Sequence, residues 1–196
     1  MKVIGVTGGI GAGKSTVIKI AQENFPVAVI YTDDVAKEQM KKGGCSYFDV
    51  VKEFGEGILD EEGEIDRSKL AEIVFSDNFK VQRINQITHP NVKRYTLSKI
   101  EEYRQSGIYQ AVLVETALLF EAKFDQFCDI TLFVDASEEV RRKRLIYSRN
   151  YSEEKIDAIL ENQRKVSYAK QHCSFIIRND ENTRMEDIVE KLKMVI

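Results

Sequence analysis

The sequence predicts an α/β fold of three layers, in which helices cover both faces of a five-stranded parallel sheet. Short apolar runs rich in Val, Ile or Phe predict buried strands at residues 3–6, 27–31, 110–115, 130–134 and 175–178. Helical patterns separate these runs, and this alternation indicates parallel strands joined by right-handed crossovers. A glycine-rich loop directly follows the first run, where such folds bind their ligands.

That loop is a full match to the phosphate-binding pattern G-x-x-x-x-G-K-[S/T]. It reads Gly8-Gly9-Ile10-Gly11-Ala12-Gly13-Lys14-Ser15. Its amide N–H groups and the helix that follows are expected to point at a nucleoside triphosphate, with Lys14 reaching the β- and γ-phosphates and Ser15 offering its hydroxyl to Mg²⁺. The predicted nucleotide contacts are Gly9, Gly11, Ala12, Gly13, Lys14, Ser15 and Thr16. The pattern predicts a P-loop NTPase fold; a flexible glycine-rich turn is the alternative.

Two carboxylates, Asp33 and Asp34, follow the second predicted strand at its carboxyl end. A carboxylate at this position can orient an acceptor hydroxyl and take its proton during phosphoryl transfer. We assign this role to Asp33, because Asp34 is suited to cap a helix that runs from Val35 onward.

The stretch between the second and third strands predicts a helical insert at about residues 35–106. Helical patterns cover residues 46–54, 67–75 and 77–103. We expect Asp66 to cap the second helix and Pro90 to break or kink the third. The insert forms either a wall of the substrate cleft or a helical cover for the edge of the sheet.

A second helical insert, at about residues 137–170, is strongly basic where it begins. Its basic side chains are Arg141, Arg142, Lys143, Arg144 and Arg149. Phosphoryl transfer needs positive charge over the transferring oxygens without access for water, so this group predicts a lid. For any single arginine, a solvated helix face is the alternative.

The composition limits the classes of function. A chain of 196 residues, 43% of them hydrophobic, suits a single domain, with core segments at about 1–34, 107–136 and 171–196. A net charge of −3 with mixed signs disfavours nucleic-acid or membrane binding, and no apolar run is long enough to cross a bilayer. The three cysteines are far apart in the sequence, which disfavours a zinc site or disulfides. Free thiols and the lack of a secretion signal favour the cytoplasm.

The phosphate loop alone does not decide the reaction. An Asn/Thr-Lys-x-Asp guanine-binding motif, typical of GTPases, and the Ser-Gly-Gly-Gln motif of transporter ATPases are both absent from the sequence. The position of Asp33 favours a small-molecule kinase.

Taken together, these motifs resemble the dephospho-coenzyme A kinase family over essentially the whole chain. The matching segments are residues 6–16, 32–36, 62–70, 74–75, 89–90 and 118–121, Gln163 in the lid, and residues 176–179. The resemblance implies ATP- and Mg²⁺-dependent phosphorylation of the 3′-hydroxyl of the ribose of dephospho-coenzyme A, the last step of coenzyme A synthesis.

The resemblance also implies site residues. Asp33 and Lys14 would act in catalysis, Arg144 and Arg149 would close over the γ-phosphate, and Asn179 would lie near the adenine. The acceptor would contact Asp33, Arg67, Lys69, His89, Leu118 and Glu121. For Arg67, Lys69 and His89, a helix salt bridge or a buried capping histidine is the alternative.

Some positions depart from the family pattern. Tyr31 replaces the first aspartate of Asp-Ala-Asp, Ala117 replaces a proline, Ser174 stands where an aspartate is common, and Arg149 is one residue farther from Arg144 than in the family. None removes the phosphate loop or Asp33, so we expect an active enzyme, as a monomer or small homo-oligomer. The alternatives are another nucleoside or nucleotide monophosphate kinase and a non-catalytic ATP-binding regulator.

Overall fold

The computed structural model describes residues 1–161 and 164–196. Gln163, matched to the lid glutamine of the family, lies outside these residues. The strands are β1 (Lys2–Gly8), β2 (Val27–Tyr31), β3 (Ala111–Glu115), β4 (Ile130–Asp135) and β5 (Phe175–Arg178). The helices are α1 (Lys14–Asn24), α2 (Thr32–Gln39), α3 (Tyr47–Phe54), α4 (Arg67–Phe75), α5 (Asn78–Ser106), α6 (Glu138–Arg149), α7 (Glu153–Glu161), α8 (Arg164–His172) and α9 (Met185–Val195), with short 3-10 turns at Glu56–Ile58 and Asp125–Phe127.

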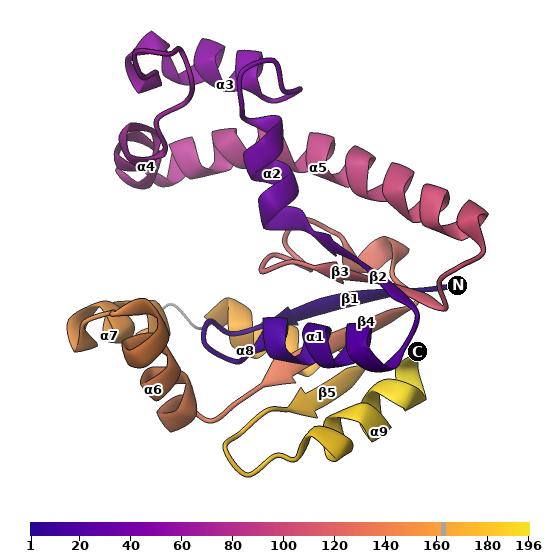
Figure 1. Ribbon diagram of the computed structural model, residues 1–196. Helices are drawn as coiled ribbons and strands as arrows, with labels where there is room; N and C mark the ends of the chain where they lie inside the picture. The colour runs from indigo at the N-terminus through magenta and orange to yellow at the C-terminus, as the bar shows by residue number, and fades with distance from the viewer. Residues whose placement is uncertain (162–163) are drawn as a thin grey trace. The chain divides into compact units, whose positions relative to one another are not determined.

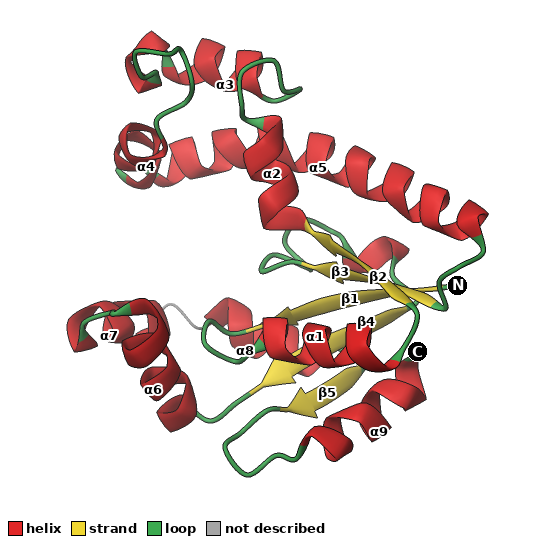
Figure 2. Cartoon of the chain, in the orientation of Figure 1, coloured by secondary structure: helices red, strands yellow, loops and turns green. Residues whose placement is uncertain are grey.

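The five strands form one parallel sheet in the order β2-β3-β1-β4-β5 (Figure 2). The predicted fold class and all five predicted strands are therefore confirmed. β1 lies at the centre, with Val6 paired to Glu115 of β3 and to Leu132 of β4. This register places the carboxyl ends of β1, β3 and β4 beside the loop that follows β1.

The chain forms two compact units, residues 1–30 with 100–196, and residues 31–99. In the first unit, α1 and α9 pack together on one face of the sheet, while α8 packs against β1 and β4 from the other (Figure 1). Side chains of both helices join the core of the first face, among them Val17, Ile18 and Leu192. Because both faces are covered, the interior residues of β1 are all buried.

The unit of residues 31–99 has its own apolar cluster around Val50, Ile58, Leu70 and Val74. The prediction for Asp66 is confirmed, because its carboxylate accepts the backbone N–H groups of Ser68 (2.8 Å) and Lys69 (3.2 Å) at the start of α4.

Two predictions for this unit are wrong. First, α2 begins at Thr32, so Asp34 lies inside its first turn and does not cap a helix that starts at Val35. Second, Pro90 does not break α5, which runs from Asn78 to Ser106; a kink there, the other expected outcome, stays a prediction. Proline removes only one backbone donor from the helix, and side chains of the same stretch add bonds to other carbonyls, from Thr88 to Ile84 (2.9 Å) and from Asn91 to Ile87 (3.3 Å).

Candidate active site

The glycine-rich loop joins β1 to α1, and glycine is required at several of its positions. A Cβ on Gly8 would lie 2.4 Å from the carbonyl oxygen of Val134 in β4. Gly11 (φ 77°) and Gly13 (φ 85°) have left-handed backbones, which other residues adopt only with strain. Gly13 is also the N-cap residue of α1, so the N–H groups of the first helical turn, where Ser15 lies exposed, begin at the loop.

Lys14 spans the base of this loop. Its Nζ donates to the carbonyl oxygen of Gly8 (3.1 Å) and lies 3.6 Å from the Oε1 atom of Glu115, at the end of β3. Both side chains are mostly buried, with 17% and 15% exposed. Glu115 therefore holds the lysine at the edge of the sheet where the phosphates are expected.

Arg144 and Asn179 hold the second half of the loop. The Arg144 guanidinium donates to the carbonyl oxygens of Gly11 (3.3 Å) and Ala12 (3.1 Å), and to that of Asn179 (2.8 Å). The Asn179 side-chain amide donates to the carbonyls of Ala12 (3.1 Å) and Gly13 (3.3 Å). Arg144 was predicted to close over the γ-phosphate and Asn179 to lie near the adenine, and in the structure both bind carbonyl groups of the phosphate loop.

Arg141 holds the first half of the loop, a contact that the sequence did not predict. Its Nε donates to the carbonyl oxygen of Ile10 (2.9 Å), and only 7% of the residue is exposed. Burial lowers the pKa of Arg141 from its usual value, although Glu138 and Asp135 partly oppose this. The spacing of Arg141 and Arg144 was the available signal, since residues three apart share one helix face.

The other basic residues of α6 serve different purposes. Arg142 forms ion pairs with Glu138, Glu153 and Asp157. Lys143 pairs with Glu139 and Glu181. Arg149 is exposed at the end of α6, and five residues of helix turn it about 140° away from Arg144. Because α6 is one continuous helix, Arg149 does not share the face that contacts the loop.

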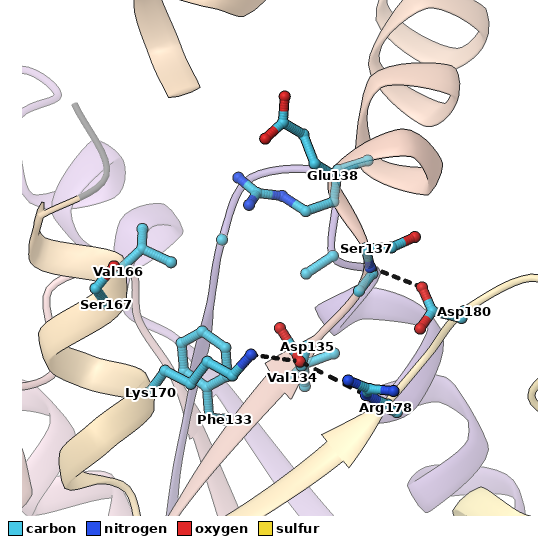
Figure 3. A pocket seen from close by; sticks show the side chains of 14 residues that line it. Phe133, Val134, Asp135, Ser137, Glu138, Val166, Ser167, Lys170, Arg178 and Asp180 are labelled. Atoms are coloured by element: carbon cyan, nitrogen blue, oxygen red, sulfur yellow. Dashed lines mark hydrogen bonds and ion pairs between the residues drawn. The ribbon is translucent and has the colours of Figure 1, made fainter. Parts of the chain in front are cut away.

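A polar cavity of about 350 Å³ opens beside Gly9 and Ala12, at the carboxyl ends of β4 and β5 (Figure 3). Asp135 binds the Lys170 ammonium group (2.8 Å) in this cavity, and Arg178 lies 3.9 Å away. Asp180 accepts the N–H of Ser137 (2.7 Å), and this hydrogen bond lowers the pKa of Asp180. These contacts join α8, the end of β4 and the segment after β5.

A smaller cavity of about 160 Å³ lies at the carboxyl ends of β1 and β4, where the segment after β3 also reaches. Leu118 and Glu121, both predicted to contact the acceptor, line it together with Thr7, Gly8 and Phe133. The structure thus brings these two predicted residues close to Gly8, whose carbonyl oxygen accepts the Lys14 hydrogen bond.

Asp33 and Asp34 are exposed in the first turn of α2, directly after β2. The Asp34 carboxylate accepts a hydrogen bond from Lys37 (2.6 Å) one turn along the same helix. The Asp34 carboxylate is therefore paired with a lysine of the same helix.

The remaining predicted acceptor residues also lie in the unit of residues 31–99. Arg67 is exposed at the first position of α4, and His89 is half-buried in the middle of α5. The Lys69 ammonium group donates to the carbonyl oxygen of Leu59 (2.7 Å), next to the bridge between Leu59 and Ile65. Lys69 therefore stabilises the turn that precedes α4.

Within residues 1–161 and 164–196, no helix has the length and apolar character needed to cross a membrane. The same residues contain no group of three or more histidine, cysteine or acidic side chains placed to hold a metal ion.

A phosphate loop with its lysine at the carboxyl edge of a parallel sheet, in contact with a basic helix, defines a P-loop NTPase, a fold that includes many kinases. The dephospho-CoA kinase family model matches residues 2–185. The chain belongs to the dephospho-CoA kinase family.

Similar proteins agree with this membership. A dephospho-CoA kinase of Carboxydothermus hydrogenoformans is 37% identical, covering 98% of this chain and 95% of its own, and one of Bacillus thuringiensis is 34% identical, covering 98% of both. The solved structure of a dephospho-CoA kinase from Campylobacter jejuni aligns with a TM-score of 0.70 at 25% identity, over 98% of this chain and 94% of that one. A shikimate kinase from Bacteroides thetaiotaomicron shares the fold, with a TM-score of 0.52 at 15% identity, over 99% and 95% of the two chains.

Proposed function

We propose that this chain transfers the γ-phosphoryl group of ATP to the 3′-hydroxyl of the ribose of dephospho-CoA, releasing coenzyme A and ADP. Membership of the family gives the ATP-dependent reaction and a small-molecule substrate. The observation that carries the proposal is the loop from Gly8 to Ser15. Side chains of Arg141, Arg144 and Asn179 donate to its carbonyl groups, and Lys14 donates to the carbonyl of Gly8.

The loop would bind the triphosphate through its backbone N–H groups. Lys14 would leave the Gly8 carbonyl to contact the β- and γ-phosphates, with Glu115 keeping it in place. Gly9, Gly11, Ala12 and Gly13 would surround the phosphates, while Thr16 is exposed in the first turn of α1. Asn179, bound to the loop, would border the base of the nucleotide.

Asp33 would receive the acceptor. Its carboxylate would orient the 3′-hydroxyl and accept its proton as the new bond between O3′ and the γ-phosphorus forms. The bond between that phosphorus and the β–γ bridging oxygen breaks at the same time, and its electron pair leaves with ADP. Arg67, Lys69 and His89 would contact the rest of the acceptor, together with Leu118 and Glu121.

Mg²⁺ would be held mainly by the nucleotide. Ser15 offers an exposed hydroxyl at the start of α1, and Mg²⁺ in kinases takes one or two protein oxygens beside phosphate and water. The position of Ser15 therefore fits an Mg²⁺ ion that is bound together with the nucleotide. The ion would neutralise charge on the β- and γ-phosphate oxygens.

The lid would consist of α6 and α7, because α8 packs against the sheet. Arg144 already lies at the loop, where its positive charge would lie close to the bound phosphates. Arg149 would approach the γ-phosphate only if the end of α6 moved. These lid roles, and the division into core, insert and lid, remain predictions.

The test is ADP release from ATP and Mg²⁺ with dephospho-CoA as acceptor, beside adenosine monophosphate and thymidine monophosphate. We expect turnover with dephospho-CoA alone. Turnover only with a nucleoside monophosphate would show the alternative kinase, and ATP binding without any turnover would show a non-catalytic regulator.

We further propose a cytoplasmic protein that is a monomer or a small homo-oligomer and binds neither nucleic acid nor membranes. The free thiols of Cys45, Cys128 and Cys173 suit a reducing compartment. Light scattering at several protein concentrations measures the oligomeric state.

A further inference from the structure

We propose that Arg141 is a positioning residue for the phosphate loop: it fixes the first half of the loop in the shape that binds the triphosphate. This inference rests on the proposed function, because it assumes that ATP binds at this loop. It concerns a residue that the phosphate-binding pattern does not contain and that lies far along the chain from it.

The contacts of Arg141 reach the first half of the loop. Its Nε donates to the carbonyl oxygen of Ile10 at 2.9 Å. Its guanidinium fills the space beside Gly9, where an added Cβ would lie 2.8 Å from Cζ. Beside Gly11, a Cβ would meet the carbonyl oxygen of Arg141 at 3.0 Å. Two glycines of the loop, Gly9 and Gly11, therefore leave room for Arg141.

The Ile10 hydrogen bond also sets the direction of a loop donor. In a trans peptide the C=O and the N–H point in opposite directions. Holding the Ile10 oxygen toward α6 therefore turns the Gly11 N–H to the opposite side. Arg144 and Asn179 do the same for the peptides that follow Ala12 and Gly13. Arg141 completes this set of bonds at the start of the loop.

The burial of Arg141 argues that its charge has a purpose there. Only 7% of the residue is exposed, and removing a guanidinium from water is costly. A methionine would fill the same space without that cost. Two carboxylates, Glu138 and Asp135, face it from α6 and the end of β4. A positive charge held beside the loop also favours a bound polyphosphate.

The neighbouring Arg142 provides a matched control. It has the same side chain on the same helix, but it pairs with Glu138, Glu153 and Asp157 instead of the loop. Arg141→Met and Arg142→Met each remove one guanidinium from α6, and Arg141→Lys keeps the charge and one donor. Comparing them separates contact with the loop from general effects on the helix.

The experiment measures the Kd of ATP by calorimetry without acceptor, then KM for each substrate and kcat. We expect Arg141→Met to raise the Kd and KM of ATP about 10- to 100-fold, as for loss of one hydrogen bond from a charged donor. KM for dephospho-CoA should stay within about twofold, because the bond of Arg141 goes to the loop that is proposed to bind the nucleotide. Arg141→Lys should recover part of the loss, and Arg142→Met should keep the Kd of ATP of the unaltered protein, because Arg142 pairs with carboxylates instead of the loop.

Several results would overturn the proposal. In Arg141→Met, a lower melting temperature with an unchanged Kd for ATP would show a structural role only. Equal effects of Arg142→Met would show that the helix, and not the loop contact, is responsible. If Arg141→Met does not fold, the test rests on Arg141→Lys. A Kd and a KM for ATP equal to those of the unaltered protein in Arg141→Lys would contradict the need for a guanidinium. Failure of the unaltered protein to use dephospho-CoA would overturn the proposed function alone, since ATP binding is measured without acceptor.

Discussion

The phosphate loop and the unit of residues 31–99 hold their predicted functional residues in different ways. At the loop, Arg141, Arg144 and Asn179 come from distant parts of the chain to bind carbonyl groups of one short segment. In the other unit, Asp33 and Arg67 are exposed at the start of separate helices, and Lys69 supports a nearby turn.

The proposed nucleotide loop is thus held by bonds from outside it, whereas Asp33 and Arg67 lie on separate helices. A preorganised loop binds a nucleoside triphosphate at little further cost in ordering. Under the proposed function, selectivity for the acceptor would depend on the predicted acceptor residues. Substitutions in the two regions should therefore have different signatures in binding, turnover and stability.

The largest expected effect is in the acceptor region. Asp33→Asn should lower kcat about 10²- to 10⁴-fold, the usual contribution of a general base. The Kd of ATP should stay unchanged, because Asp33 does not belong to the phosphate loop. Calorimetry and ADP release measure the two quantities.

Asp34→Asn is the control for Asp33→Asn. It removes a neighbouring carboxylate that is bound to Lys37 within α2, so its turnover should be near that of the unaltered protein. Near-normal turnover in Asp33→Asn would remove Asp33 from the mechanism, and equal losses in both variants would point to α2 as a whole.

Local patterns explain why most of the fold was predictable. The strands are short apolar runs, and the loop after β1 is recognised by glycines whose backbone conformations require them, such as Gly11 and Gly13. The cap by Asp66 follows from its place before an apolar helical pattern. Each of these signals lies within a few residues of the feature that it predicts.

The contact of Arg141 with Ile10 was missed because it joins residues that are distant in the chain. The spacing of Arg141 and Arg144 indicates that they share one helix face, but not that this face meets the loop. The role of Arg149 over the γ-phosphate came from the family resemblance and stays a prediction, although its position around α6 separates it from Arg144. A break at Pro90 was predicted from a local rule for proline, and α5 nevertheless continues through it.

The next effect tests how tightly the loop is packed. Gly13→Ala should be strongly destabilising, because its φ is 85° and an added Cβ would lie 2.1 Å from the Asn179 side chain. Gly43→Ala is the control, with φ 84° and no atom within 4 Å of the added Cβ. Backbone strain alone costs about 1–2 kcal/mol. Urea unfolding should show a clearly larger loss for Gly13→Ala, and equal losses would mean that the Asn179 contact yields easily.

A smaller effect is expected from the helix cap in the unit of residues 31–99. Asp66→Ala removes the acceptor of two backbone N–H groups and should lower the free energy of unfolding by about 0.5–2 kcal/mol. Glu72→Ala, at an exposed position of the same helix, should change it little. Urea titrations of both variants measure this. If Asp66→Ala were as stable as Glu72→Ala, water would replace the carboxylate at no cost.

The smallest expected effect is on the pH dependence of stability, through the carboxylate of Asp180. The Ser137 N–H bond lowers the pKa of Asp180, so the ionised carboxylate stabilises the folded chain at every pH above the ordinary aspartate value of about 3.9. That contribution disappears as the pH falls through the lower folded value. Asp180→Asn should therefore be slightly less stable than the unaltered protein at pH 5–7, with a gap that narrows in more acidic urea titrations. Glu181→Gln, which removes a charge paired with Lys143 at the surface, controls for net charge. A gap that widened toward acid would mean that the folded state favours the protonated form of Asp180, contrary to its hydrogen bond.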